Sequence, residues 1–267
     1  MDAVLRLVAA FGRPAIDFLI YLARISKLAL DTLKWTFVAP FRGAKIRWHM
    51  VAEQGVLIGW QSIPIVSVIA FFVGLILAMQ AAHQLKPFGA EVFVANLVSV
   101  AQTRSLGPII TAIVIAGRSG SAIAAELGTM KVAEELDALQ TMGLNPISFL
   151  VVPRFIAMMI MLPALTLIAD IVGITGAYVF TTGALDVTSV RFISQVANAL
   201  VISDVTTGLI KTMFFALIIV GVGCYQGFIV DGGAAGVGRS TTRSVVISIF
   251  LIIFADVIFT AFFLFFL

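Results

Sequence analysis

Residues 56–82 read VLIGWQSIPIVSVIAFFVGLILAMQAA and contain no charged side chain. A helix needs about 20 apolar residues to cross the hydrocarbon core of a bilayer. This run is longer than that and lacks the period-two alternation of a strand in a membrane barrel. It therefore predicts a membrane-spanning helix.

The composition extends this prediction to the whole chain of 267 residues. Hydrophobic residues make up 61% and charged residues 12%, whereas a soluble domain is about half apolar and a quarter charged. Further apolar runs, with isolated charges at most, cover about residues 92–116, 155–182, 205–230 and 245–267. We predict an all-α membrane protein with five transmembrane helices.

The segment before the first span has a different pattern. Charged side chains recur at steps of three and four on one helical face: Arg24, Lys27, Asp31 and Lys34. The opposite face is apolar: Phe18, Leu22, Ile25, Ala29, Leu33 and Phe37. We predict an N-terminal interfacial region over 1–55 with an amphipathic helix, and a five-span membrane domain over 56–267. A short sixth span is the alternative.

The distribution of basic residues predicts the orientation. They are concentrated in the N-terminal region, in 117–154 and in 231–244, while the opposite loops hold only Lys86 and Arg191. Because basic loops stay in the cytoplasm, we expect a cytoplasmic N-terminus. The net charge of +3 follows this asymmetry, so it does not indicate nucleic acid as a partner.

A short helix is predicted at about 131–142, between the second and third spans. It has an apolar stripe of Val132, Leu136 and Leu139, and an acidic face of Glu134, Glu135 and Asp137. Gly143 and Asn145-Pro146 end it. A helix this short is marginal alone in water, so the stripe packs either on its own chain or on a soluble partner.

The stretch GPIITAIVIAGRSGSAIAAELGTMKVAEELDAL at 107–139 resembles the signature of the MlaE-type permease family, as does GRSTTRSVV at 238–246. These proteins are the membrane subunits of ABC transporters that work with MCE-domain proteins. The resemblance covers the chain from about residue 50 to its end. It implies transport of phospholipid or a related lipid in a bacterial inner membrane.

The resemblance also implies partners. We expect a permease homodimer, an ABC ATPase bound at the cytoplasmic face by the helix at 131–142, and an MCE-domain protein at the periplasmic face. No cofactor is expected in this chain, since ATP and magnesium would bind the ATPase. The glycine-rich DGGAAGVGRST at 231–241 lacks the Gly-Lys-Ser/Thr of a phosphate loop, which agrees with a separate ATPase.

Six residues are candidates for contact with lipid. Arg104 and Ser105 lie on the second span, and the resemblance implies that the outer end of the first span lines a lipid pocket with Leu77, Gln84, Leu85 and Phe88. Arg104 suits a lipid phosphate, and the alternative is an ion pair with Asp170 or Asp256. Many family members carry Glu where this chain has Ser105, so a mechanism that needs a carboxylate there is in doubt.

Two other functions compete with the permease. Asp170 and Asp256 could serve a proton-coupled secondary transporter, although isolated acids on different spans more often pair with Lys211, Arg104 or a hydroxyl. An intramembrane lipid-modifying enzyme would need convergent catalytic groups. His49 and His83 lie outside the predicted spans, which weakens that reading.

Overall fold

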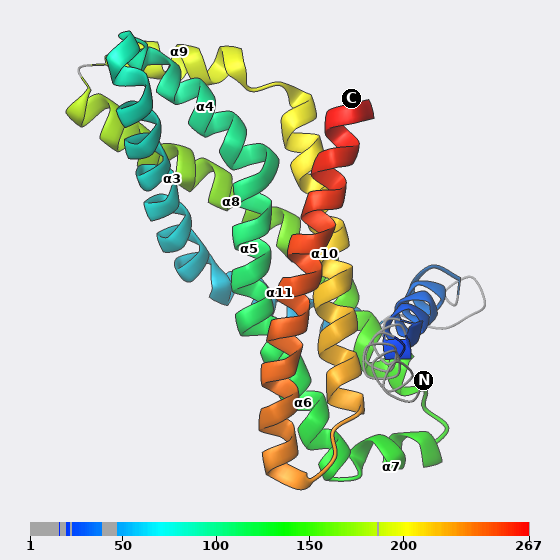
Figure 1. Cartoon of the computed structure of the whole chain (residues 1–267). Helices are drawn as coiled ribbons and strands as arrows, with labels where there is room; N and C mark the ends of the chain where they lie inside the picture. The colour runs from blue at the N-terminus through cyan, green and yellow to red at the C-terminus, as the bar shows by residue number, and fades with distance from the viewer. Residues whose placement is uncertain (1–15, 17–19, 22, 39–46, 186, 267) are drawn as a thin grey trace, which may run out of the picture.

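The computed structural model describes residues 16, 20–21, 23–38, 47–185 and 187–266. Phe18 and Leu22 of the predicted amphipathic helix lie outside these residues. The described chain is an elongated bundle of helices, in which α10 and α11 run side by side and α3 packs on α8 (Figure 1). The helices α9 and α7 lie at opposite ends of the bundle.

The five-span prediction is confirmed. Five helical segments of the described chain are long and apolar enough to cross a membrane: Trp48–Phe88, Glu91–Val132, Ile147–Ala184, Ile202–Phe228 and Gly233–Phe263. Three of the five helical segments extend beyond their apolar runs at both ends, and the other two extend only at their starts, since helical structure continues into the polar flanks. The second reaches Val132 rather than residue 116.

Each segment contains several elements. The first holds α2 (Trp48–Ile58), η3 (Trp60–Ser62), α3 (Ile63–Leu85) and η4 (Lys86–Phe88). The second holds η5 (Glu91–Phe93), α4 (Val94–Ala101), η6 (Gln102–Leu106), α5 (Gly107–Ile115), η7 (Ala116–Gly120) and α6 (Ser121–Val132). The remaining elements are α7 (Glu135–Thr141), η8 (Ile147–Val151), α8 (Val152–Ala184), α9 (Ser189–Ala199), α10 (Ile202–Phe228) and α11 (Gly233–Phe266).

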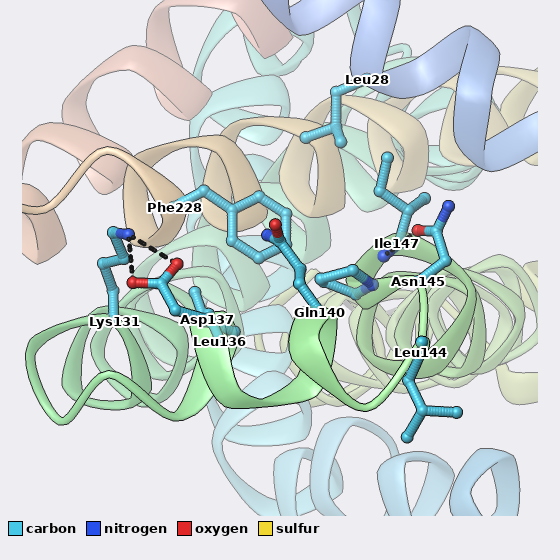
Figure 2. A pocket seen from close by; sticks show the side chains of 11 residues that line it. Leu28, Lys131, Leu136, Asp137, Gln140, Leu144, Asn145, Ile147 and Phe228 are labelled. Atoms are coloured by element: carbon cyan, nitrogen blue, oxygen red, sulfur yellow. Dashed lines mark hydrogen bonds and ion pairs between the residues drawn. The ribbon is translucent and has the colours of Figure 1, made fainter.

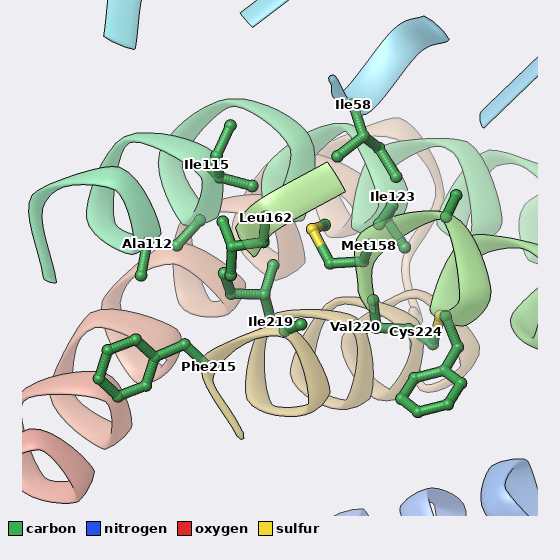
Figure 3. Packing of buried hydrophobic residues seen from close by; sticks show 14 of the residues in the cluster. Ile58, Ala112, Ile115, Ile123, Met158, Leu162, Phe215, Ile219, Val220 and Cys224 are labelled. Atoms are coloured by element: carbon green, nitrogen blue, oxygen red, sulfur yellow. The ribbon is translucent and has the colours of Figure 1, made fainter. Parts of the chain in front are cut away.

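Large apolar side chains from α5, α8 and α10 meet in the centre of the bundle (Figure 3). Ile115, Met158, Leu162, Phe215 and Ile219 are all fully buried there. Lipid tails are as apolar as these side chains, so close packing rather than exclusion from water holds the helices together.

Glycines bring α3 and α8 into backbone contact. A Cβ added at Gly74 would lie 1.9 Å from the carbonyl oxygen of Gly173. One added at Gly176 would lie 2.2 Å from the carbonyl oxygen of Phe71. Any larger residue at either position would force the two helices apart, so this pair behaves as one unit.

Helical residues 23–33, followed by η1 (Lys34–Val38), form the described part of the N-terminal region. Arg24 and Lys27 are exposed, while Ile25 and Leu28 are buried. Ile25 lies against Gly221 of α10, so the apolar face of this helix packs on its own chain. The predicted boundary at 55/56 falls inside α2.

Candidate functional site

A widened turn places Arg104 and Ser105 on the second span. Pro108 has no backbone N–H, so the carbonyl of Arg104 lacks its usual helical donor. The chain forms a π-helix over η6, in which the N–H of Gly107 donates to the carbonyl of Gln102. Such π-turns are frequent at functional sites because they redirect side chains.

Arg104 forms an ion pair with Asp204. The Nε to Oδ1 distance is 3.0 Å, and the two side chains are 47% and 7% exposed. Asp204 Oδ2 also accepts a hydrogen bond from the backbone N–H of Val201, at 3.2 Å, at the start of α10. In the described part of the chain, Nη1 and Nη2 of Arg104 have no hydrogen-bond partner, so both can reach a ligand.

The predicted alternative partners of Arg104, Asp170 and Asp256, were therefore wrong. Asp204 was missed because it lies one residue before the predicted fourth span. An available signal was its place in the first turn of a helix, where an acidic residue is favoured.

Lys211 and Asp256 form a second pair, inside the bundle. Lys211 Nζ lies 2.9 Å from Asp256 Oδ1 and donates to Thr260 Oγ1 at 2.8 Å. The two charged side chains are only 3% and 13% exposed. Lys211 Nζ also lies 3.5 Å from Ser105 Oγ. This confirms that Asp256 pairs with Lys211.

The two cations, Arg104 and Lys211, line one cavity of about 210 Å³ between the second, fourth and fifth spans. Its walls come from α4, η6, α10 and α11: Val100, Ala101, Arg104, Ser105, Thr207, Lys211, Thr260 and Phe263. Ligand pockets usually measure roughly 300–1,000 Å³, so this cavity can hold part of a lipid rather than a whole one. A Glu at position 105 would add a carboxylate beside Lys211, whereas Ser105 adds only a hydroxyl.

The structure separates the six predicted lipid contacts into two groups. Arg104 and Ser105 line the cavity, but the four residues of the first span do not. Leu77 and Leu85 pack in a cluster with residues of α4 near the α9 end of the bundle. Gln84 and Phe88 are exposed.

Asp170 lies elsewhere, on α8. Its carboxylate is buried against Gly107, where an added Cβ would lie 1.8 Å from Oδ1, and Oδ1 has no hydrogen-bond partner in the described chain. Asp256 is held by Lys211 on the other side of the site. Among the described residues, no hydrogen bond links the two acids.

At the other end of the bundle, α7 differs from the predicted helix at 131–142. It begins at Glu135, after Glu134 adopts a left-handed conformation with φ 59°. Lys131 and Val132 belong to α6, so the predicted apolar stripe is divided between two helices. The chain leaves α7 through Gly143, whose φ is 75°.

The two faces of α7 have different surroundings. Leu136 is buried and Leu139 half-buried, both in the core of this chain. Figure 2 shows Leu136 and Gln140 beside a cavity of about 520 Å³ that also meets Leu28 and Phe228. The acidic residues Glu134, Glu135 and Asp137 are exposed, and so is Met142.

Two ion pairs lie at this end of the bundle, and one of them includes a residue of α7. Lys131 of α6 lies 3.2 Å from Asp137 of α7 (Figure 2). Arg154 at the start of α8 is buried, lies 2.7 Å from Glu126 of α6, and donates to the carbonyl of Leu150 at 2.7 Å. The first pair therefore joins α7 to α6, and the second joins α6 to α8, the two helices that flank α7 in the chain.

Residues 51–262 match the family model described as Permease MlaE. This chain belongs to the MlaE permease family. A probable ABC transporter permease of Rickettsia typhi is 40% identical over 79% of this chain and 82% of its own length. Another from Synechocystis is 41% identical over 79% and 81%. The chloroplastic protein trigalactosyldiacylglycerol 1 of Arabidopsis thaliana is 36% identical over 82% and 63%.

Membership confirms the resemblance found in the sequence. An MlaE permease is the multi-pass membrane subunit of an ABC transporter, not its ATPase, and it implies an ATPase partner. The five apolar helices agree with this assignment.

Proposed function

We propose that this MlaE permease moves phospholipid or a related membrane lipid between the bacterial inner membrane and an MCE-domain partner. ATP hydrolysis takes place on a separate subunit. The observation that carries the proposal is the cavity at Arg104, where free guanidinium nitrogens, Lys211 and hydroxyls meet apolar walls. The name of the Arabidopsis relative refers to a lipid, which supports a lipid as cargo.

The chemistry of the cavity suits the polar end of a lipid. A cation at membrane depth is costly and marks a substrate path or a partner. Arg104 already has Asp204, yet its Nη atoms remain available, and guanidinium binds phosphate oxygens in a fork. The apolar walls at Val100 and Phe263 would contact the first carbons of an acyl chain.

Arg104→Lys is expected to lower lipid occupancy several-fold while leaving the fold intact. The ammonium of lysine can still pair with Asp204, but it cannot offer two parallel donors to a phosphate. Phospholipid that co-purifies with the detergent-solubilised complex is measured by mass spectrometry, together with lipid-stimulated ATP hydrolysis.

Arg104→Ala should lower the co-purified phospholipid and the lipid-stimulated ATP hydrolysis further, because the positive charge is also lost. Asp204→Asn is the matched control for the ion pair, since it removes the carboxylate and keeps Arg104. Wild-type occupancy and turnover in Arg104→Lys and Arg104→Ala would remove the phosphate-contact role from Arg104. The family assignment would still hold.

The same proposal includes the assembly. The exposed acidic face of α7 supports docking of a basic groove on the ATPase. The cavity at Arg104 is too small for a whole lipid, which supports a homodimer whose second copy completes the pocket. The MCE-domain partner would then bind at the α9 end of the bundle.

The orientation is tested with single cysteines in a Cys224→Ala background. The basic loops support a cytoplasmic N-terminus and a cytoplasmic α7. Thr141 of α7 and Ser194 of α9 are both exposed and lie at opposite ends. With a permeabilised outer membrane, an impermeant thiol reagent should label Ser194→Cys and not Thr141→Cys. The opposite result would reverse the orientation and remove α7 as an ATPase dock.

A further inference from the structure

A second polar cavity lies at the turn between α10 and α11, far from Arg104. Its volume is about 350 Å³, and its polar lining consists of Gln226, Asp231, Arg239, Ser240 and Arg243. Gln226 and Ser240 are only 2% and 8% exposed, so these two polar side chains belong to the buried wall of the cavity. None of the five has a role in the proposed transport site.

Charges of opposite sign face this cavity without joining. Among the described residues, neither Arg239 nor Arg243 has an ion-pair or hydrogen-bond partner, although Asp231 lines the same cavity. A guanidinium nitrogen of Arg239 lies 3.3 Å from where a Cβ would stand on Gly232, so its charge rests against the turn. The cavity therefore offers an anion site and a cation site side by side.

Gln226 forms the buried inner wall of the cavity and is held there by a hydrogen bond. Its side-chain Nε2 donates to the hydroxyl of Tyr21 at 2.7 Å, and the amide oxygen is buried with no donor among the described residues. Burial raises the pKa of Tyr21, which the hydrogen bond from Gln226 and the charge of Arg243 oppose. Tyr21 precedes helical residues 23–33, whose cations are exposed, so the cavity opens near the headgroup region.

We propose that this cavity binds a lipid headgroup that carries both a phosphate and a primary ammonium, as phosphatidylethanolamine does. Arg239 and Arg243 bind the phosphate, for which guanidinium is suited. Asp231 accepts hydrogen bonds from the ammonium. A purely anionic headgroup would leave Asp231 facing it with like charge, and a quaternary ammonium could not donate to the carboxylate.

The proposal rests on the proposed function in two respects: it takes membrane lipid as the ligand class, and it takes the α10–α11 turn as cytoplasmic. The site lies at the opposite end of the spans from Arg104, so the two can be tested separately. Its place at the α10–α11 turn suits binding of lipid from the inner leaflet.

The test uses the purified transporter complex and short-chain phosphatidylethanolamine, phosphatidylglycerol and phosphatidylcholine, with binding followed by native mass spectrometry. We expect the wild type to prefer phosphatidylethanolamine by roughly ten- to a hundredfold, the scale of one hydrogen bond to a charged group. Asp231→Asn should abolish this preference and keep phosphatidylglycerol binding. Arg243→Ala should weaken binding of all three lipids.

Matched controls distinguish the α10–α11 cavity from the cavity at Arg104, and a lipid headgroup from the free phosphodiester. Arg191→Ala removes an exposed arginine on α9, and Arg104→Ala removes the other site; both should keep the preference. Equal binding of all three lipids, or no effect of Asp231→Asn, would overturn the proposal. Glycerophosphoethanolamine that binds as tightly as the lipid would overturn the lipid assignment, since the acyl chains would then contribute nothing.

Discussion

Lys211→Met is expected to destabilise the permease by about 3–5 kcal/mol, the effect of removing one partner from a buried ion pair. Lys211 and Asp256 are 2.9 Å apart and almost fully buried between α10 and α11. Without the ammonium, Thr260 is the one hydrogen-bond partner left to Asp256 among the described residues, and an uncompensated carboxylate would remain at membrane depth. The free energy of unfolding in mixed micelles, measured by titration with a denaturing detergent, reports the loss.

The double variant Lys211→Met/Asp256→Leu is the control. It replaces both charges with apolar side chains of similar size, so most of the lost stability should return. Lys86→Met removes a lysine that is exposed and should change little. A wild-type unfolding curve for Lys211→Met would show that the pair contributes no stability, and that Asp256 tolerates isolation.

The spans could be predicted from the sequence because lipid demands long apolar helices, and few other structures satisfy the backbone there. The ends of the spans could not be predicted, since polar residues beyond the apolar runs continue the helices. The isolated charges within the spans also allowed a prediction, because lipid disfavours an unpaired charge. An intramembrane acid such as Asp256 needs a partner, and Lys211 was among the candidates.

The cavity itself could not be predicted, because its walls come from three spans that are distant in sequence. Asp204 lies at a helix start, outside the apolar run, so its position in the sequence indicated an acid at a helix terminus but did not identify Arg104 as its partner. The π-turn that carries Arg104 depends on Pro108, whose effect on the helix could be foreseen, but not the direction of the side chains.

The short helix at the α7 end was predicted, but not its beginning. Most of residues 131–139 are good helix formers, and local propensity alone would continue α6 into α7. The break at Glu134 brings Leu136 into the core, so packing overrides propensity there. Consequently Leu136 and Leu139 face the chain itself while Val132 is exposed on α6, and the exposed acidic face is left for a partner.

Glu135→Lys is therefore expected to release the ATPase from the purified complex while the permease remains folded. Glu135 is exposed on α7, and Met142 lies exposed just beyond its end, so neither stabilises the permease. If a basic groove receives this face, reversing one charge would cost about 2–5 kcal/mol of binding free energy. The amount of ATPase that co-purifies with an affinity-tagged permease measures the effect.

Two variants make the result specific. Glu53→Lys makes the same charge change at an exposed position of α2 and should keep the ATPase. Leu136→Asp places a charge in the core and should lower the stability of the permease itself, whether or not the ATPase is present. If Glu135→Lys retains a stoichiometric ATPase, and Leu136→Asp loses it only through unfolding, α7 packs on its own chain and the ATPase docks elsewhere.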